Sequence, residues 1–350
     1  SIVRCHHKPC HVGIGSGSNQ PMNNLRSITA TIVFISFTYN YNGMIASALL
    51  SKYLLPFCRR QRALYSQLRK PDFITSTKSN TVKKIQSLLK RPKKRAESGE
   101  TIVEGPRMVF DLLENPRTTN LVRQVVVSAD KSDWTTELLS KYDDIHVCQG
   151  TSEVLEAISD TVTPQGIIAR VEIPSLDQIS NNENKTNLYL LLDGVSDPGN
   201  VGTLLRSAVA VGVSAVILLP GCCDVWSPKA IRSAMGCSFQ LPITSVNSIS
   251  NSLQLFGLEG QNVYAATMDE SNGVPSIPYY DVGWSNSDSA LIIGSEGTGL
   301  SQEVRNIAAA GKIRTVHVPM QQGIESLNAA VCGSVILFDY QRQCQTSRLQ

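Results

Sequence analysis

The hydrophobic residues between positions 188 and 318 fall into short runs that do not alternate with polar residues. Strands of this kind are apolar on both faces, which is typical of a parallel sheet covered by helices on both sides. The runs predict strands at Leu188–Leu192, Ser214–Leu219, Asn262–Ala266, Ala290–Ile293 and Arg314–Val318. Apolar residues at helical spacing predict helices at Gly202–Val211, Pro228–Met235, Ser301–Ala309 and Ser326–Tyr340. We therefore expect an α/β domain over residues 188–345.

A smaller α/β unit is expected upstream, over residues 72–175. Helical spacing is found at Thr81–Leu89, Pro106–Leu113 and Trp134–Lys141. Strand patterns are found at Thr101–Gly105, Leu121–Ser128 and Ile167–Val171. The polar, Asn-rich stretch that follows has no periodicity, so residues 176–187 are predicted to be a linker.

The positive charge of the chain is concentrated near its beginning. The 350 residues include 32 basic and 29 acidic ones, but residues 1–71 contain nine of the basic residues and no acidic residue. Residues 72–350 therefore carry a net charge of −6. A long acid-free stretch rich in Arg and Ser is typical of an organelle transit peptide. We expect a disordered leader over residues 1–71, centred on Met44–Ser66, with Met44 as the true start. A basic arm that stays on the mature protein and binds RNA is the alternative.

No membrane span and no metal site are expected. The apolar run Ile28–Phe37 has ten residues, whereas a membrane-spanning helix needs about 20. The nine cysteines include no C-x-x-C pair and are too few for a disulfide scaffold in a chain of this length. Residues 5–11 (Cys-His-His-Lys-Pro-Cys-His) offer soft metal ligands, but they lie in the expected leader without a second half of a site.

Three loops that follow predicted strands carry the candidate chemistry. The first, Asp193–Gly202, is rich in Gly and Pro, and Asn200 is a candidate N-cap of the next helix. Arg206 lies less than two turns into that helix among small and apolar residues. An arginine in such surroundings either extends to solvent or contacts an anion, and the spacing alone does not separate the two.

The second loop, Gly294–Ser301, contains three glycines and Glu296. It has neither the G-K-[ST] of a P-loop nor the G-x-G-x-x-G spacing, so it favours a nucleoside-type ligand held by backbone groups. The third loop, Pro319–Asn328, is polar, and Ser326 is the candidate N-cap of the final helix. Because open α/β sheets bind ligands at the carboxyl ends of their strands, we expect the three loops to form one site.

The three loops resemble the signature motifs of the SpoU (TrmH-like) branch of the SPOUT RNA methyltransferases. Asn200–Arg206 matches N-x-G-x-x-x-R, Gly294–Leu300 matches G-x-E-G-x-G-L, and Val318–Asn328 matches I/V-P-M…E-S-L-N. Ser227–Gly236 is similar to the family's S-P-K…R-x-S-x-G segment, so the resemblance spans roughly residues 185–342. Upstream, Ile74–Asn80 and Val103–Arg107 resemble the substrate-binding domain of many members.

The resemblance implies an S-adenosylmethionine-dependent RNA 2′-O-ribose methyltransferase with a trefoil-knotted α/β domain. It implies cofactor contacts from Gly294, Val318 and Leu327. It also implies catalytic roles for five motif residues, which are Asn200, Arg206, Glu296, Ser326 and Asn328. Because the pKa of an arginine lies above about 12, we expect Arg206 to orient a phosphate and stabilise the developing alkoxide. Its service as a base stays open.

The resemblance further implies a homodimer whose sites are completed at the subunit interface, and an rRNA or tRNA substrate. The expected transit peptide indicates a chloroplast or mitochondrion as the location. The apolar final helix fits a dimer interface and a domain core equally well. RNA contacts are expected from Lys83–Arg95, which we call the cationic segment. Binding of its cations to an RNA backbone should weaken steeply with salt. Its basic residues are Lys83, Lys84, Lys90, Arg91, Lys93, Lys94 and Arg95. A solvated charged turn is the alternative.

Three other functions fit the sequence less well. An RNA-binding ribosome-assembly factor with the same fold and no catalysis is disfavoured by the complete set of motif residues. A nicotinamide-dependent enzyme is disfavoured by the glycine spacing and by the lack of a ribose-binding acid after the first loop's helix. A SPOUT enzyme that methylates a base is disfavoured by the E-S-L-N loop.

Overall fold

A computed structural model describes residues 70–175, 187–258, 262–268, 275–284, 288–324 and 326–347. Residues Arg69–Gln350 form one compact unit. Nearly all of the expected leader, residues 1–69, and the linker up to residue 186 lie outside the described residues. No helix in the described ranges is long and apolar enough to cross a membrane.

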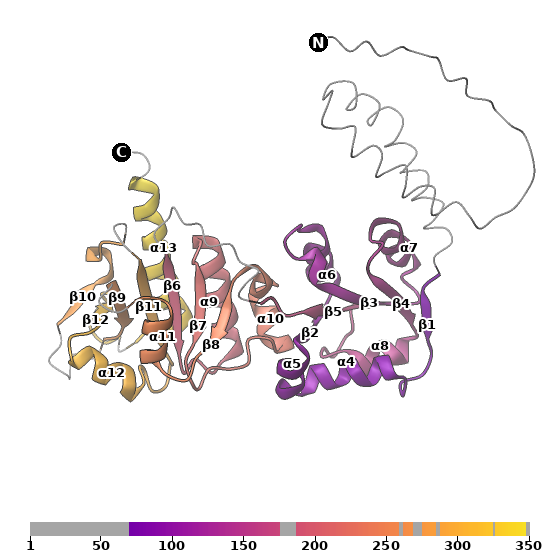
Figure 1. Ribbon diagram of the computed structural model, residues 1–350, viewed down its shortest axis with the longest axis horizontal. Helices are drawn as coiled ribbons and strands as arrows, with labels where there is room; N and C mark the ends of the chain where they lie inside the picture. Colours follow the sequence, from indigo (N-terminus) through magenta and orange to yellow (C-terminus); the bar gives the residue numbers. More distant parts are fainter. Residues whose placement is uncertain are drawn as a thin grey trace, which may run out of the picture. The chain divides into compact units, whose positions relative to one another are not determined.

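The upstream part of the unit is built on a five-stranded sheet with the order β1-β4-β3-β5-β2 (Figure 1). β1, β4 and β3 are parallel, whereas β5 runs antiparallel to both β3 and β2. The strands are β1 (Asp72–Ile74), β2 (Glu100–Glu104), β3 (Val122–Ser128), β4 (His146–Gly150) and β5 (Ile167–Glu172). The helices are α4 (Asn80–Lys90), α5 (Pro92–Ser98), α6 (Pro106–Glu114), α7 (Ser132–Lys141) and α8 (Ser152–Ile158).

The helices of this part bury their apolar stripes on opposite faces of the sheet. α4 and α8 share one buried cluster, to which Ile85 and Val154 belong, and α6 and α7 contribute to another, to which Val109 and Leu138 belong. α4 starts where the Ser79 hydroxyl accepts a hydrogen bond from the Val82 amide, because a side-chain oxygen satisfies a free donor of the first turn. The short elements α5, α8, β1 and β4 were not predicted.

The downstream part is a seven-stranded sheet with the order β10-β12-β9-β11-β6-β7-β8, in which every pairing is parallel. Its strands are β6 (Leu188–Asp193), β7 (Ala215–Leu218), β8 (Ile243–Ser245), β9 (Asn262–Ala266), β10 (Ser276–Pro278), β11 (Ser289–Gly294) and β12 (Arg314–His317). Every residue of the central strand β11 is buried, which explains its apolar run. The predicted parallel α/β architecture is confirmed, and the two edge strands β8 and β10 were not predicted.

Helices cover both faces of this sheet. The helices are α9 (Pro198–Val211), α10 (Pro228–Ala234), α11 (Ile249–Leu255), α12 (Gln302–Ala309) and α13 (Ala329–Ser347). α9 and α13 bury one face, with Leu204 and Leu337 in a common cluster, while α11 and α12 bury the other. The carboxyl ends of β6, β9, β11 and β12 therefore stay free for loops.

Two helix starts differ from the predicted ones. The N-cap of α9 is Asp197, whose carboxylate accepts from the Asn200 amide, and not Asn200 itself. α13 begins at Ala329, and the Asn328 side chain accepts from the Ala330 and Val331 amides at 2.9 and 3.2 Å. Ser326 is therefore not the cap, because Asn328 satisfies the free donors of the first turn.

Candidate active site

Three side chains from the three motif loops meet in one hydrogen-bonded group. Asn200, near the start of α9, donates through Nδ2 to the Glu296 carboxylate in the loop after β11. Asn328, just before α13, donates through Nδ2 to the side-chain oxygen Oδ1 of Asn200 at 2.9 Å. Asn200 is thus brought together with residues 96 and 128 positions further along the chain by the common edge of the sheet. We call Asn200, Glu296 and Asn328 the amide–carboxylate cluster.

The first loop is held so that the Asn200 side chain is free to join this cluster. Because Asp197 caps α9, the Asn200 side chain is not used up as a cap. The carbonyl of the neighbouring Gly199 accepts from the Ser233 hydroxyl of α10 at 2.9 Å. α10 also packs so closely on α9 that a Cβ at Gly202 would lie 2.4 Å from that of Ser233. The position of the first loop therefore depends on α10.

The second loop is a tight turn closed by backbone contacts. Ser295 and Gly299 exchange backbone hydrogen bonds of 3.0 Å in both directions. A Cβ on Gly294 would lie 2.6 Å from the carbonyl group of Gly299, so this position has room only for glycine. The buried carboxylate of Asp193, at the end of β6, accepts from the Ser301 amide at 2.6 Å and anchors the end of the loop.

A cavity of about 290 Å³ opens beside the cluster. Gly294, Val318 and Leu327, the three residues expected to contact a cofactor, all line it, as do Glu296 and Ser326. The remaining lining residues are Ala266, Thr267, Met268, Ile293, Ser295, Gly299, His317, Met320, Ala329 and Cys332. Much of this wall is small or apolar, which suits a flat organic ligand held by backbone groups.

Four polar or sulfur-containing lining residues were not predicted from the sequence. Thr267 and Met268 directly follow β9, and His317 ends β12, so the strand-end argument could have found them. Cys332 lies one turn into α13, where no local signal marks it. Burial raises the pKa of the Cys332 thiol, so this side chain is a neutral part of the wall at pH 7.

Arg206 is exposed and has no hydrogen bond to the cluster among the described residues. It lies six positions after Asn200 on α9, which is about 9 Å along the helix and roughly a third of a turn around its axis. Burial raises the pKa of the Cys237 thiol, and the positive charge of Arg206 partly offsets this increase. The Arg206 side chain is therefore accessible to a ligand or to another chain.

The cationic segment presents six of its seven basic residues to solvent. Lys84 pairs with Glu100 at 2.8 Å and Lys94 with Glu97 at 2.8 Å. The other exposed members are Lys83, Lys90, Arg91 and Lys93. Arg95 corrects the prediction, since only 3% of it is exposed and its guanidinium is bonded to Asp224, Leu88 and Leu89. It is therefore too buried to contact an RNA phosphate.

One group among the described residues has metal-ligand chemistry: Asp72, His146 and Cys148, on β1 and β4. Its donor atoms already satisfy one another. His146 Nε2 lies 2.7 Å from the Asp72 carboxylate, and the Gln124 amide nitrogen lies 3.1 Å from His146 Nδ1 and 3.3 Å from Cys148 Sγ. If the Gln124 amide donates its two hydrogens to His146 Nδ1 and Cys148 Sγ, the ring proton of His146 lies on Nε2 and points to the Asp72 carboxylate. The group is explained as a hydrogen-bonded patch on the sheet.

Comparison with protein families matches both parts of the chain. The model of the SpoU rRNA methylase family matches residues 187–338, and the model of the MRM3-like substrate-binding domain matches residues 79–169. The first match contains all three motif loops and the cavity. The second contains the five-stranded sheet except for β1 and the end of β5.

Individual relatives extend over both parts. The mitochondrial rRNA methyltransferase 3A of Danio rerio is 29% identical over 308 residues, which cover 75% of this chain and 68% of the relative. The 23S rRNA (guanosine(2553)-2′-O)-methyltransferase RlmP of Bacillus subtilis is 30% identical over 266 residues, which cover 76% of this chain and 97% of the relative.

Solved structures agree with this assignment. The SpoU methyltransferase AviRb from Streptomyces viridochromogenes, crystallised with AdoMet, is 27% identical, and its TM-score is 0.64 over 77% of this chain and 99% of that one. An RNA 2′-O ribose methyltransferase structure has 26% identity and a TM-score of 0.60 over 78% and 99% of the two chains. With its motif loops, its cavity and these relatives, the chain belongs to the SpoU family of RNA methyltransferases.

Proposed function

We propose that this protein transfers a methyl group from S-adenosylmethionine to a ribose 2′-hydroxyl of an organellar rRNA or tRNA. The observation that carries the proposal is the amide–carboxylate cluster beside the cavity. The relative RlmP is named as a 2′-O-methyltransferase of 23S rRNA, and one structural neighbour is named as an RNA 2′-O ribose methyltransferase. Both names support ribose over base as the target.

The cavity fits the expected cofactor. Gly294 brings backbone close to the ligand space, and Leu327, Ile293 and Ala266 give an apolar wall for a base. Two related SpoU-type structures contain AdoMet, which supports the same ligand here. When bound, S-adenosylmethionine supplies a methyl group that is already activated by the adjacent sulfonium. The task left for the protein is to align the ribose oxygen and to help its proton leave.

The cluster is suited to holding a ribose. Asn328 is bonded to Asn200, and Asn200 is bonded to Glu296, so the two side-chain amides have fixed directions. Ser326 lies on the cavity wall and offers a hydroxyl that donates or accepts. In our proposal these groups fix the sugar, while Arg206 orients the adjacent phosphate and stabilises negative charge on the 2′-oxygen as its proton leaves.

We further propose that the active enzyme is a homodimer in which Arg206 of one chain completes the site of the other. Arg206 is exposed and makes no hydrogen bond to the cluster among the described residues of its own chain. Beside it, Ser207 of α9 shares a 2.7 Å hydrogen bond with Ser334 of α13, and α13 exposes about half of Val331 and Phe338. Exposed apolar side chains next to a charged group favour an interface.

Mixing two inactive variants tests this arrangement. Arg206→Ala chains and Asn200→Ala chains are each expected to form inactive homodimers. If the sites are shared, dimers assembled from both variants contain one intact site and recover part of the activity. A mixture whose methyltransferase activity is no higher than that of either variant alone would contradict a shared site.

The RNA grip is proposed to come from residues 72–175, through the exposed cations of α4, α5 and their junction. Lys83, Lys84, Lys90, Arg91, Lys93 and Lys94 form the proposed RNA-binding set, from which the buried Arg95 is left out. The acidic balance of the rest of the chain makes a local basic surface necessary for a polyanionic substrate.

Transfer of radiolabelled methyl from S-adenosylmethionine to organelle RNA tests the activity, and mapping of 2′-O-methylated nucleotides in RNA from cells with and without the gene tests the atom. Label that appears on a ribose oxygen and disappears with the gene is expected. A chain that binds RNA but transfers no label would favour the assembly-factor function, and label on a base would contradict ribose specificity.

An organellar location is part of the proposal. Relatives in Danio rerio, Mus musculus and Homo sapiens are named as mitochondrial proteins, and the acid-free leader fits import. Expression of the full chain fused to a fluorescent protein would distinguish chloroplast from mitochondrion. A uniformly cytosolic signal would contradict the organellar location.

A further inference from the structure

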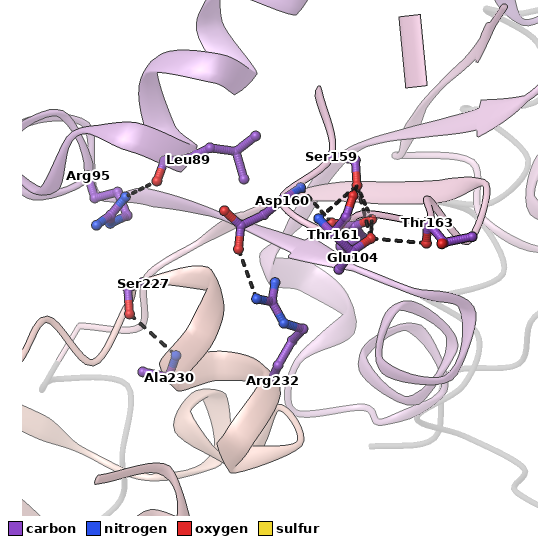
Figure 2. A network of polar contacts seen from close by, with 10 residues as sticks. All are labelled: Leu89, Arg95, Glu104, Ser159, Asp160, Thr161, Thr163, Ser227, Ala230 and Arg232. Atoms are coloured by element: carbon purple, nitrogen blue, oxygen red, sulfur yellow. Dashed lines mark hydrogen bonds and ion pairs between the residues drawn. The ribbon is translucent and has the colours of Figure 1, made fainter. Parts of the chain in front are cut away.

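Two ion pairs join the five-stranded part of the chain to the seven-stranded part. The arginine comes from the five-stranded part in one pair and from the seven-stranded part in the other. Arg95 of α5 pairs with Asp224, in the loop between β7 and α10, at 2.5 Å. Arg232 of α10 pairs with Asp160, in the turn after α8, at 2.8 Å. Figure 2 shows the Arg232–Asp160 pair and, in the same view, Arg95 bonded to Leu89. Each part thus supplies one arginine and one aspartate.

Hydrogen bonds within the five-stranded part hold the Arg95 guanidinium in position to meet Asp224. Its Nη1 group donates to the carbonyls of Leu88 and Leu89, in the last turn of α4, where a helix leaves acceptors without partners. Its Nε and Nη2 groups both donate to one oxygen of Asp224. The side chain is nearly fully buried. A buried guanidinium that lost its carboxylate would be strongly unfavourable, so the pair selects one docked arrangement.

The second pair rests on an equally ordered turn. The buried Glu104 carboxylate accepts from the Asp160 amide at 2.9 Å and from the hydroxyls of Ser159 and Thr161 (Figure 2). This holds the Asp160 carboxylate toward Arg232. Apolar residues of the downstream part, Ile231 and Phe239, complete the contact by packing into a core cluster of the upstream part.

The same segment leads directly to the first loop of the active site. Asp224 accepts from the Trp226 amide, and the Ser227 hydroxyl caps α10 by accepting from the Ala230 amide. At the other end of α10, Ser233 donates to the carbonyl of Gly199, next to Asn200. We call the two ion pairs, Arg95–Asp224 and Asp160–Arg232, the junction. The junction is therefore connected to the amide–carboxylate cluster through one short helix, α10. The cofactor cavity is lined only by residues from 266 to 332, so no part of the junction touches it.

We propose that Arg95, Asp224, Asp160 and Arg232 are positioning residues that hold the RNA-binding part in the one orientation in which the target ribose reaches the amide–carboxylate cluster. This inference rests on the proposed function. It assigns to the junction the alignment of RNA, not the binding of RNA or of cofactor. Loosening the junction should lower the turnover of bound RNA while both ligands still bind.

Substitution of the junction carboxylates in the full chain tests this proposal. Asp224→Asn removes one charge without changing the size of the side chain and leaves Arg95 bonded to α4. We expect kcat for RNA methylation to fall roughly 10- to 100-fold, the range set by small misplacements of a reacting group. The KM for RNA and the Kd for S-adenosylmethionine should change less than about threefold. Small-angle scattering should show a wider distribution of distances within the molecule.

Asp160→Asn serves as a second variant, because its pair is partly exposed and its loss should cost little stability. A decrease in kcat of about 3- to 10-fold is expected, in the same direction. Glu172→Gln is the matched control, since it breaks the Arg123–Glu172 pair that lies within the five-stranded part. This control should keep the kcat of the unchanged protein.

The proposal is overturned if both junction variants keep kcat within about twofold, or if they lose RNA or cofactor affinity in proportion to activity. It is also overturned if scattering from both variants is identical to that of the unchanged protein. Absence of RNA methylation by the unchanged protein would contradict the proposed function instead, and the scattering result would still decide whether the ion pairs hold the two parts together.

Discussion

The cofactor side and the RNA side of the site are built differently. The cavity lies at the edge of one sheet, and all of its walls come from residues 266–332 of a single chain. In our proposal, the RNA side depends on distant residues. Ser233 of α10 holds the first loop, ion pairs join α10 and the loop before it to the upstream part, and Arg206 makes no hydrogen bond to the cluster among the described residues. A single chain is therefore expected to bind cofactor by itself, while methyl transfer needs the whole assembly.

The largest expected effect separates the two sides at Arg206. Arg206→Ala should lower kcat for RNA methylation by about 100- to 1,000-fold, because a charged group that stabilises a developing oxyanion contributes about 3–4 kcal/mol. The Kd for S-adenosylmethionine, measured by calorimetry, should not change. Lys312→Ala removes an exposed cation of the same part and should leave both values unchanged. A variant at Arg206 with nearly full activity would refute its catalytic role.

A smaller effect is expected on the cofactor side from Gly294→Ala. The new methyl group would lie 2.6 Å from the carbonyl of Gly299, so the turn must shift, at a cost of about 1–3 kcal/mol. Calorimetry should show cofactor affinity lowered roughly 5- to 150-fold. Gly297→Ala is the control in the same loop, because a Cβ there meets nothing within 4 Å. Equal affinities for the two variants would argue against close packing at Gly294.

The cationic segment should affect RNA affinity in a salt-dependent way. Among the described residues, no ion pair is recorded for Lys83, Lys90 or Arg91, so their combined replacement by Gln should lower affinity about tenfold at moderate salt. It should also reduce the slope of log K against log salt by about 2–3. Lys141→Gln is the control, since Lys141 pairs with Glu137 on α7. An unchanged slope would mean that these cations face solvent only.

The smallest expected effect concerns Cys332. Because burial raises the pKa of its thiol, little thiolate is present at pH 7, and the rate of alkylation should rise as pH increases toward that pKa. Bound cofactor should slow the reaction several-fold, as measured by mass spectrometry of peptides, while Cys344 provides an internal comparison. Equal alkylation rates with and without cofactor would remove Cys332 from the ligand wall.

The sequence predicts the parts of this protein whose pattern is set locally. Five central strands and the loops after them could be located because strands buried on both faces have few polar residues. The caps could not be chosen correctly, since Asp197 and Asn200 are both good capping residues and only the partners Glu296 and Asn328 decide between them. The burial of Arg95 depends on its ion pair with Asp224, which lies 129 positions away. No local signal in the cationic segment therefore distinguishes Arg95 from its exposed neighbours.

The reciprocal ion pairs also set a rule for recombining relatives. A chimera that takes its upstream part from one SpoU enzyme and its downstream part from another inherits half of each pair. Only a donor that supplies both an arginine at the position of Arg95 and an aspartate at that of Asp160 will match the Asp224 and Arg232 already present. A mismatched transplant would leave Asp224 or Arg232 without its partner at the contact between the two parts, so retargeting this enzyme to another RNA should exchange the junction together with the domain.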